Sequence, residues 1–207
     1  MTSSTANDTR ERILAAAATV LSRKGYAGAR LSDIAELAEL RTPAVYYYFE
    51  SREHLVNEVM TVGQSSVLDH VATAIEALPD EADALTKLDA AVRAHLEVEL
   101  TLSDFATAVT RNGGQLPPEL QEAFKADSRR YFAMWDGILG DLAADGVLDL
   151  DLDVRVARML VLGALNWTAE WWDIRHGELD DVIETAQIFV RGSLLKRPCD
   201  DLYSNID

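Results

Sequence analysis

The stretch that decides the fold runs from Leu31 to Phe49, LSDIAELAELRTPAVYYYF, and is followed by ESREHL. In its first half, apolar residues recur at spacings of three and four, which predicts one buried face of a short helix. Pro43 favours the first turn of a second helix, where its missing N–H costs no hydrogen bond, and Thr42 is the expected N-cap. Two short helices joined by a tight turn have the geometry of a helix-turn-helix.

The second of these helices has an inner and an outer face. Val45 and Phe49 are four residues apart and should point inward. The outer face presents hydroxyl, methyl and aromatic groups: Thr42, Ala44, Tyr47 and Tyr48. Such groups suit contacts with base edges in the DNA major groove, so this helix is the expected recognition helix.

The runs DIAELA, TPAVYYYF and SREHL, preceded by an amphipathic helix ending in KGYAG, resemble the N-terminal domain of TetR-family transcriptional regulators. The likeness covers roughly Thr9 to Val59. The family usually has Gly in the turn where this chain has Glu39, and a non-Gly residue at positive φ costs about 1 kcal/mol. The usual Thr pair before the first of these helices is Ala29-Arg30 here.

Composition and pattern predict an all-α protein of about nine helices, because apolar residues make up 48% of the 207 and no alternating strand-like runs occur. The resemblance implies a three-helix helix-turn-helix domain over residues 1–57 and a helical effector-binding and dimerisation domain over 58–207. Asp8 and Glu11 resemble a capping box opening the first helix, and residues 1–7 are expected to be disordered. The helices are expected at about 8–25, 31–38, 43–49, 51–78, 82–100, 103–111, 118–146, 154–176 and 180–196.

The net charge of −16 is confined to one part of the chain. Up to Asn57 there are seven basic and seven acidic side chains, so 12 of the 19 basic and 28 of the 35 acidic residues lie beyond it. Polyanionic DNA would therefore be tolerated at the N-terminal end and repelled elsewhere.

The expected location is the cytoplasm. The sequence has no apolar stretch of the ~20 residues that a membrane helix needs, and its polar start is unlike a signal peptide. The single cysteine, Cys199, rules out an internal disulfide and suits a reducing compartment. The tail from Pro198 is expected to be frayed.

No metal or cofactor is predicted. His95 and Glu99 lie four residues apart and offer half a metal site, but no second pair supports it, so we interpret them as a solvated or hydrogen-bonded pair. The acidic run that begins at Asp149 starts like a calcium-binding loop but lacks its glycine, and Leu160 stands at the position of the last ligand. Asp153 is instead the expected cap of the next helix.

The residues expected to contact DNA come from the helix-turn-helix and its flanks: Arg30, Ser32, Arg41, Thr42, Pro43, Ala44, Tyr46, Tyr47, Tyr48 and Arg52. Among them Tyr46, Arg41 and Arg52 are expected to hold phosphates. Arg52 begins the following helix, capped by Ser51, where the partial positive charge of a helix N-terminus also favours an anion.

The helix from about Val154 to His176 is apolar on most sides and needs cover on more than one face. A second subunit would supply that cover through a two-fold four-helix interface, as the resemblance also implies. The residues expected at this interface lie on the last two helices: Leu160, Gly163, Ala164, Trp171, Val182, Ala186, Phe189 and Val190.

The resemblance further implies an effector pocket in the C-terminal domain. Its expected lining is aromatic and polar-tipped: Phe105, Val109, Tyr131, Trp135, Asn166, Trp167 and Glu170. Asn166 lies on an apolar helix, and a buried amide needs partners, so it bonds either a neighbouring helix or a ligand. The stretch GALNWTAEWW resembles regulators of lipid, acyl-CoA or steroid catabolism, and apolar surroundings favour a hydrophobic or amphipathic effector.

These features predict a homodimeric repressor that binds a palindromic operator as double-stranded DNA and releases it when a small molecule binds. One alternative is an all-helical enzyme. The sequence lacks a nucleophile paired with a base, a phosphate-binding glycine loop and a metal cluster, so we expect no enzymatic activity. The other is an interaction module whose helix-turn-helix does not bind DNA, which the neutral N-terminal segment and Glu39 favour.

Overall fold

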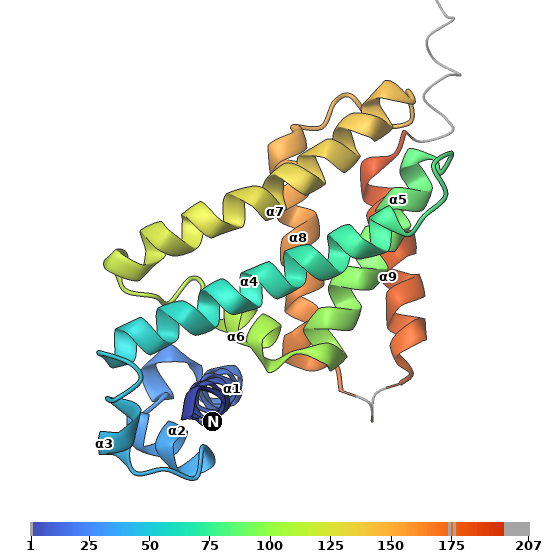
Figure 1. The fold of residues 1–207 in the computed structure, drawn as a ribbon. Helices are drawn as coiled ribbons and strands as arrows, with labels where there is room; N and C mark the ends of the chain where they lie inside the picture. The colour runs from blue at the N-terminus through green and yellow to red at the C-terminus, as the bar shows by residue number, and fades with distance from the viewer. Residues whose placement is uncertain (1, 174, 176, 197–207) are drawn as a thin grey trace, which may run out of the picture. The chain divides into compact units, whose positions relative to one another are not determined.

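The computed structural model describes residues 2–173, 175 and 177–196, and this part of the chain is helical (Figure 1). Its nine α-helices are α1 (Thr2–Gly28), α2 (Leu31–Leu37), α3 (Thr42–Val45), α4 (Arg52–Glu76), α5 (Ala84–Glu97), α6 (Asp104–Asn112), α7 (Pro118–Ala144), α8 (Val154–Trp171) and α9 (Leu179–Leu194). The prediction of an all-α fold with about nine helices is confirmed. The expectations for Cys199 and for the tail from Pro198 concern residues outside the described range.

The chain forms two compact units. The first comprises the residues up to Asp69 together with Thr101–Arg130, and the second comprises His70–Leu100 and the residues from Tyr131 onwards. These units do not follow the ranges 1–57 and 58–207, because α6 and the first part of α7 pack with the N-terminal helices. As a division into functional domains, those ranges stay a prediction.

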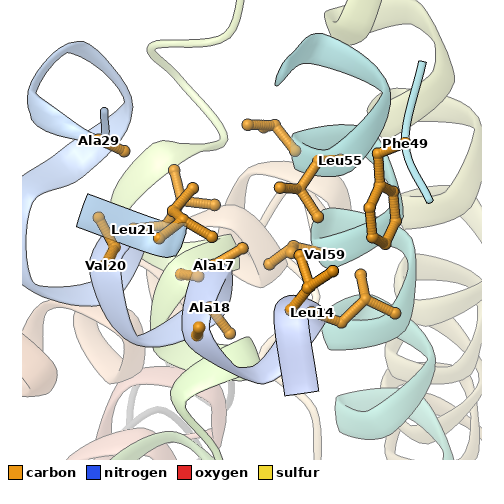
Figure 2. Close-up of a cluster of buried hydrophobic side chains, with 14 of the residues drawn as sticks. Leu14, Ala17, Ala18, Val20, Leu21, Ala29, Phe49, Leu55 and Val59 are labelled. Carbon is orange, nitrogen blue, oxygen red and sulfur yellow. The ribbon is translucent and has the colours of Figure 1, made fainter. Parts of the chain in front are cut away.

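The first unit has a core built by α1 to α4. Leu14 and Leu21 of α1 meet Phe49 and the α4 residues Leu55 and Val59 in one apolar cluster (Figure 2). Val45 and Phe49 are each 1% exposed, which confirms the inner face predicted for them.

Helix α6 packs beside α1 in this unit, and α4 approaches it closely. A Cβ added to Gly63 of α4 would lie 2.4 Å from the carbonyl oxygen of Phe105 and 2.6 Å from Cγ2 of Val109. Only glycine permits this backbone approach, because a real Cβ contact is never so short.

Two predicted helix starts are wrong. Helix α1 already begins at Thr2, so Asp8 and Glu11 lie inside it and form no capping box. The N-cap of α3 is Arg41, whose backbone is extended, and Thr42 is the first helical residue. Arg41 makes no capping bond through its side chain.

Three other expected helix ends are confirmed. Gly25 leaves the helical conformation with a φ of 69°. The Ser51 hydroxyl caps α4 by accepting from the His54 N–H at 3.0 Å, and Asp153 caps α8 by accepting from the Val156 N–H at 3.0 Å. The side-chain oxygens of Ser51 and Asp153 satisfy amides that have no partner within the helix.

In the second unit, α5, α8 and α9 run side by side and the second part of α7 contributes to their core (Figure 1). Leu88 and Leu96 of α5, Trp135 of α7 and Ile183 of α9 are completely or almost completely buried in it. Helix α5 was expected to run to Leu100. The chain instead widens after Glu97 into a π-helical turn, η1 (Val98–Leu102), which the apolar pattern does not reveal because it changes the hydrogen-bond register and leaves the residue types unchanged.

Candidate nucleic-acid interface and effector region

The recognition segment, Thr42–Phe49, begins as α3 and continues as a tighter helical turn. The amides of Tyr47 and Tyr48 donate to the carbonyls three residues back, at 3.3 and 3.0 Å, and the Phe49 amide donates to Val45 O at 3.0 Å. Regular α-helix ends at Val45, yet the helical path carries on to Phe49. The predicted split into an inner and an outer face therefore survives over the whole segment.

Its tyrosines differ in environment. Tyr47 is 84% exposed and Tyr46 is 56% exposed, whereas Tyr48 is half-buried against the core of the first unit. The rings of Tyr47 and Tyr48 meet edge to face, with 5.2 Å between their centres. This contact restricts Tyr47 and leaves its hydroxyl in solvent, ready for a partner outside the chain.

The other expected DNA contacts surround this segment. Arg30, Ser32, Arg41 and Pro43 are exposed, and Thr42 and Ala44 are half-buried. Arg30 and Arg41 are the residues immediately before α2 and α3, respectively. Cations and helix N-termini placed together suit contact with phosphates.

The turn between α2 and α3 contains Glu39, the residue with positive φ (57°) among the described non-glycine positions. The Leu40 amide donates to Ala35 O at 2.8 Å, which closes the turn over the end of α2. The turn thus has the left-handed conformation that glycine favours, although glutamate stands at this position.

Arg52 faces the protein. Its Nε donates to Ala29 O at 2.9 Å, its Nη2 donates to Tyr26 O, and its guanidinium lies 4.3 Å from the centre of the Tyr26 ring. Its side chain is 24% exposed and also pairs with Glu53 at 3.5 Å. These contacts are not those of a side chain held out for a phosphate.

Helices α8 and α9 expose an unusual number of large apolar residues. On α8, Leu160 is 69% exposed and Trp171 is 52% exposed, and on α9 Phe189 is 60% exposed. Gly163 and Ala164 are exposed between the two α8 residues, and apart from the helix's own backbone and the adjacent residues no atom lies within 4 Å of a Cβ built on Gly163. Large exposed apolar faces mark interaction surfaces.

Two expected site residues lie elsewhere than predicted. Val190 is fully buried, on the same stripe of α9 as Ile183 and Leu194, so it belongs to the chain's own core and is not available to a partner. Trp167 is 66% exposed and shares the spacing of Leu160 and Trp171, so it faces away from the core. On a helix that is apolar nearly all round, periodicity cannot distinguish the inner face from the outer one. The remaining expected interface residues, Val182 and Ala186, are half-buried.

The structure brings together part of the expected effector lining. Tyr131 and Trp135 of α7 lie in the core of the second unit, where Asn166 of α8 is half-buried. Phe105 and Val109 of α6 pack against the core of the first unit, and Glu170 is exposed.

A residue that the sequence did not assign to this region, His95 of α5, links the first group. Its Nδ1 lies 2.6 Å from the Tyr131 hydroxyl and its Nε2 lies 3.0 Å from Asn166 Oδ1. An amide oxygen only accepts, so Nε2 carries the proton and the Tyr131 hydroxyl donates to Nδ1. Asn166 thus bonds a neighbouring helix, the first of the two outcomes expected for it, and its need for a partner was the one sequence signal that pointed here.

Burial keeps the two ionisable members of this trio, His95 and Tyr131, neutral. It lowers the pKa of His95 to about 4, an effect that the bond to Asn166 only partly opposes. Burial also raises the pKa of Tyr131 well above its usual range, helped by the negative charge of Glu99. Three uncharged, directional groups therefore join α5, α7 and α8 inside a largely apolar core that also contains the buried Glu99.

Within the described residues, no group of three or more His, Cys, Asp or Glu side chains is arranged to hold a metal ion. His95 and Glu99 are both buried, so the solvated alternative is wrong for them, and His95 is hydrogen-bonded to Tyr131 and Asn166. In the same part of the chain, none of the helices has the length and apolar character required to cross a bilayer.

Two family models match the chain. The model described as "Bacterial regulatory proteins, tetR family" matches residues 13–59, and the one described as "Tetracyclin repressor-like, C-terminal domain" matches residues 81–190. The first covers the helix-turn-helix, and the second covers more than half of the whole chain.

Relatives share this arrangement over most of their length. The fatty acid metabolism regulator protein of Bacillus subtilis (strain 168) is 24% identical over 169 residues, which are 82% of this chain and 86% of that protein. The fold is shared with FadR from Bacillus subtilis, solved with stearoyl-CoA (TM-score 0.72, 22% identity, 88% of this chain and 98% of that one). The fold is also shared with AibR, solved with isovaleryl coenzyme A and operator DNA (TM-score 0.76, 19% identity, 90% of this chain and 98% of that one).

Proposed function

The chain belongs to the TetR family of bacterial regulatory proteins, and from that premise we propose that this ligand-responsive DNA-binding regulator is a homodimeric repressor released from a palindromic operator by an acyl-CoA. The observation that carries the DNA-binding part is the exposure of Tyr47 and Tyr46 on a recognition segment whose Val45 and Phe49 are buried. Because bacterial DNA lies in the cytoplasm, the protein is expected to work there.

In this proposal the recognition segment enters the major groove. Tyr47 and Tyr48 contact base edges or the adjoining sugar-phosphate, together with Thr42 and Ala44, whose methyl group suits a thymine methyl. The cations Arg30 and Arg41, with Ser32, Pro43 and Tyr46, lie along the phosphates. The neutral helix-turn-helix and the acidic remainder of the chain favour approach to DNA by the first unit alone.

The dimer forms through α8 and α9. The exposed side chains of Leu160, Trp171 and Phe189 supply apolar area, and Gly163 and Ala164 permit close approach of a second backbone. A two-fold axis would present two recognition segments to half-sites about 34–36 Å apart, one turn of the DNA helix.

The proposed effector class is supported by the chemistry of the second unit and by the ligands of similar proteins. FadR and AibR are similar proteins solved with acyl-CoA thioesters, and α5, α7, α8 and α9 of this chain offer an apolar interior with the neutral His95–Tyr131–Asn166 trio inside it. An acyl chain would suit the apolar interior, and the thioester group would suit the uncharged hydrogen-bonding side chains of the trio. Ligand binding would favour a separation of the two DNA-binding heads that no longer fits the operator.

A gel-shift experiment tests the proposal. The wild-type protein is titrated onto its own upstream region and onto scrambled DNA over a salt series, with palmitoyl-CoA, free CoA or palmitate added. We expect preferential, salt-sensitive binding to the upstream region, with release by palmitoyl-CoA and not by free CoA. Binding that is indifferent to sequence would favour the interaction module, and steady liberation of CoA thiol would favour the enzyme.

A further inference from the structure

We propose that Arg52 is a positioning residue that fixes the helix-turn-helix relative to the end of α1 and the start of α4, and that it makes no contact with DNA itself. The inference rests on the proposed DNA binding for its functional consequence, and on the contacts of Arg52 for its physical basis. Those contacts join the two ends of the segment that carries α2 and α3.

The position of Arg52 along the chain is the first observation. It is the first residue of α4, immediately after the recognition segment, while its two carbonyl partners, Tyr26 and Ala29, lie at the end of α1 and before α2. Ala29 is 2% exposed and Arg30 is the N-cap of α2. One side chain thus bonds a residue 23 positions earlier in the chain and ties the start of the helix-turn-helix to its end.

The chemistry of the two acceptors is the second observation. The last carbonyls of a helix have no partner within the helix and carry partial negative charge. The guanidinium satisfies Tyr26 O and Ala29 O at once and lies over the Tyr26 ring at 4.3 Å. A planar guanidinium makes both bonds and the stacking contact from one fixed geometry, which the smaller ammonium of lysine reproduces less well.

The third observation is what these contacts leave for DNA. Nε and Nη2 are bonded to carbonyls, and Nη1 lies 3.5 Å from Glu53 Oε1, a carboxylate that would repel a phosphate at the same place. Arg41, by contrast, is exposed on the recognition side. The two arginines therefore have different roles. Arg41 contacts the phosphates, whereas Arg52 fixes the orientation of the recognition segment relative to α1 and α4.

The test compares Arg52→Ala, Arg52→Lys and Arg41→Ala in the full chain. Both Arg52 variants should lose roughly tenfold or more in operator affinity, comparable with one lost base contact, and should keep the wild-type affinity for scrambled DNA and the wild-type salt slope. Arg41→Ala should reduce the salt slope by about one per lost phosphate contact. Restoration of operator affinity by Arg52→Lys, or a reduced salt slope in Arg52→Ala, would overturn the proposal.

A second measurement needs no DNA. Hydrogen–deuterium exchange of the free protein should be faster over residues 25–35 in Arg52→Ala than in the wild type, and unchanged in Arg41→Ala, because only Arg52 braces that segment. Unchanged exchange in Arg52→Ala would overturn the bracing role even if operator binding were weakened. Failure of the wild type to bind any operator would instead refute the proposed function and leave the exchange result standing.

Discussion

At the scale of single residues, the recognition segment places neighbouring side chains in opposite environments. Tyr47 projects into solvent, whereas Tyr48, one residue later, packs against the core of the first unit. A rotation of about 100° per residue produces this difference, because the next position on a helix lies on another face. Removal of Tyr47 and removal of Tyr48 should therefore have different effects on stability and on DNA binding.

Tyr47→Ala should leave the free energy of unfolding within about 0.5 kcal/mol of the wild type, since the ring is exposed. It should reduce discrimination between operator and scrambled DNA by about 1–3 kcal/mol per half-site. Competition gel shifts measure the second effect and denaturant unfolding the first. The control, Tyr48→Ala, should lower stability, and an unaltered operator preference in Tyr47→Ala would show that the outer face is misassigned.

His95 gives stability a pH dependence. Its pKa is lowered by burial from 6.5 in the unfolded chain to about 4 in the fold, so the unfolded state takes up the proton first on acidification. The contribution is complete above pH 6.5 and is lost as the pH falls towards 4, amounting to about 3 kcal/mol.

Urea unfolding at pH 7 and at pH 4 measures this effect. His95→Gln should show a smaller loss of unfolding free energy between the two values than the wild type. Equal losses in the two proteins would contradict the assignment.

At the scale of elements, the tight turn between α2 and α3 is maintained at some cost. Glu39 adopts a φ of 57°, which disfavours residues with a Cβ, yet the turn is closed by the bond from the Leu40 amide to Ala35 O. The buried faces of α2 and of the recognition segment hold the turn in place, through residues such as Ile34 and Val45. The turn is thus imposed by packing and not by the local preference of its own residue.

Glu39→Gly should raise the free energy of unfolding by about 0.5–1 kcal/mol, because glycine adopts positive φ without steric strain. The matched control is Glu36→Gly, an exposed position inside α2, which should lower it by about 1 kcal/mol. Thermal and denaturant unfolding of both variants measures the difference. A loss of stability in both would mean that the turn is not strained.

The sequence was a good guide where one face of a helix is polar and a poor one where both are apolar. The inner positions Val45 and Phe49 and the caps Ser51 and Asp153 followed from spacing and side-chain chemistry. The orientation of α8 did not, because apolar residues surround that helix and either face could have been the core. The bonds of Arg52 and His95 to residues far along the chain depend on tertiary packing, which no local pattern encodes.

At the scale of the whole molecule, the distribution of charge and of apolar surface separates two tasks. The segment up to Asn57 is neutral and the remainder carries the full −16, so the acidic part repels DNA while the helix-turn-helix does not. The exposed apolar residues of α8 and α9 lie in the acidic part, where contact with DNA would be least favourable. We therefore expect self-association and DNA binding to use different surfaces.

Leu160→Glu should weaken the proposed dimer by about 3 kcal/mol, roughly a hundredfold in dissociation constant, because two exposed leucines lose their apolar cover at once. Sedimentation equilibrium measures the constant directly. Leu150→Glu is the control: Leu150 is 71% exposed but lies between α7 and α8, outside both helices of the proposed interface. A dimer constant unchanged by Leu160→Glu would exclude this face of α8.

The indole side chains of α7 and α8 give the protein an optical probe of its own assembly. Trp135 is fully buried within one chain, whereas Trp167 and Trp171 are exposed to solvent. Pairing of two copies across α8 would bury the two exposed indoles and leave the environment of Trp135 unchanged. Dilution of the unlabelled protein in a fluorimeter should then shift its tryptophan emission towards the red as the pairs come apart.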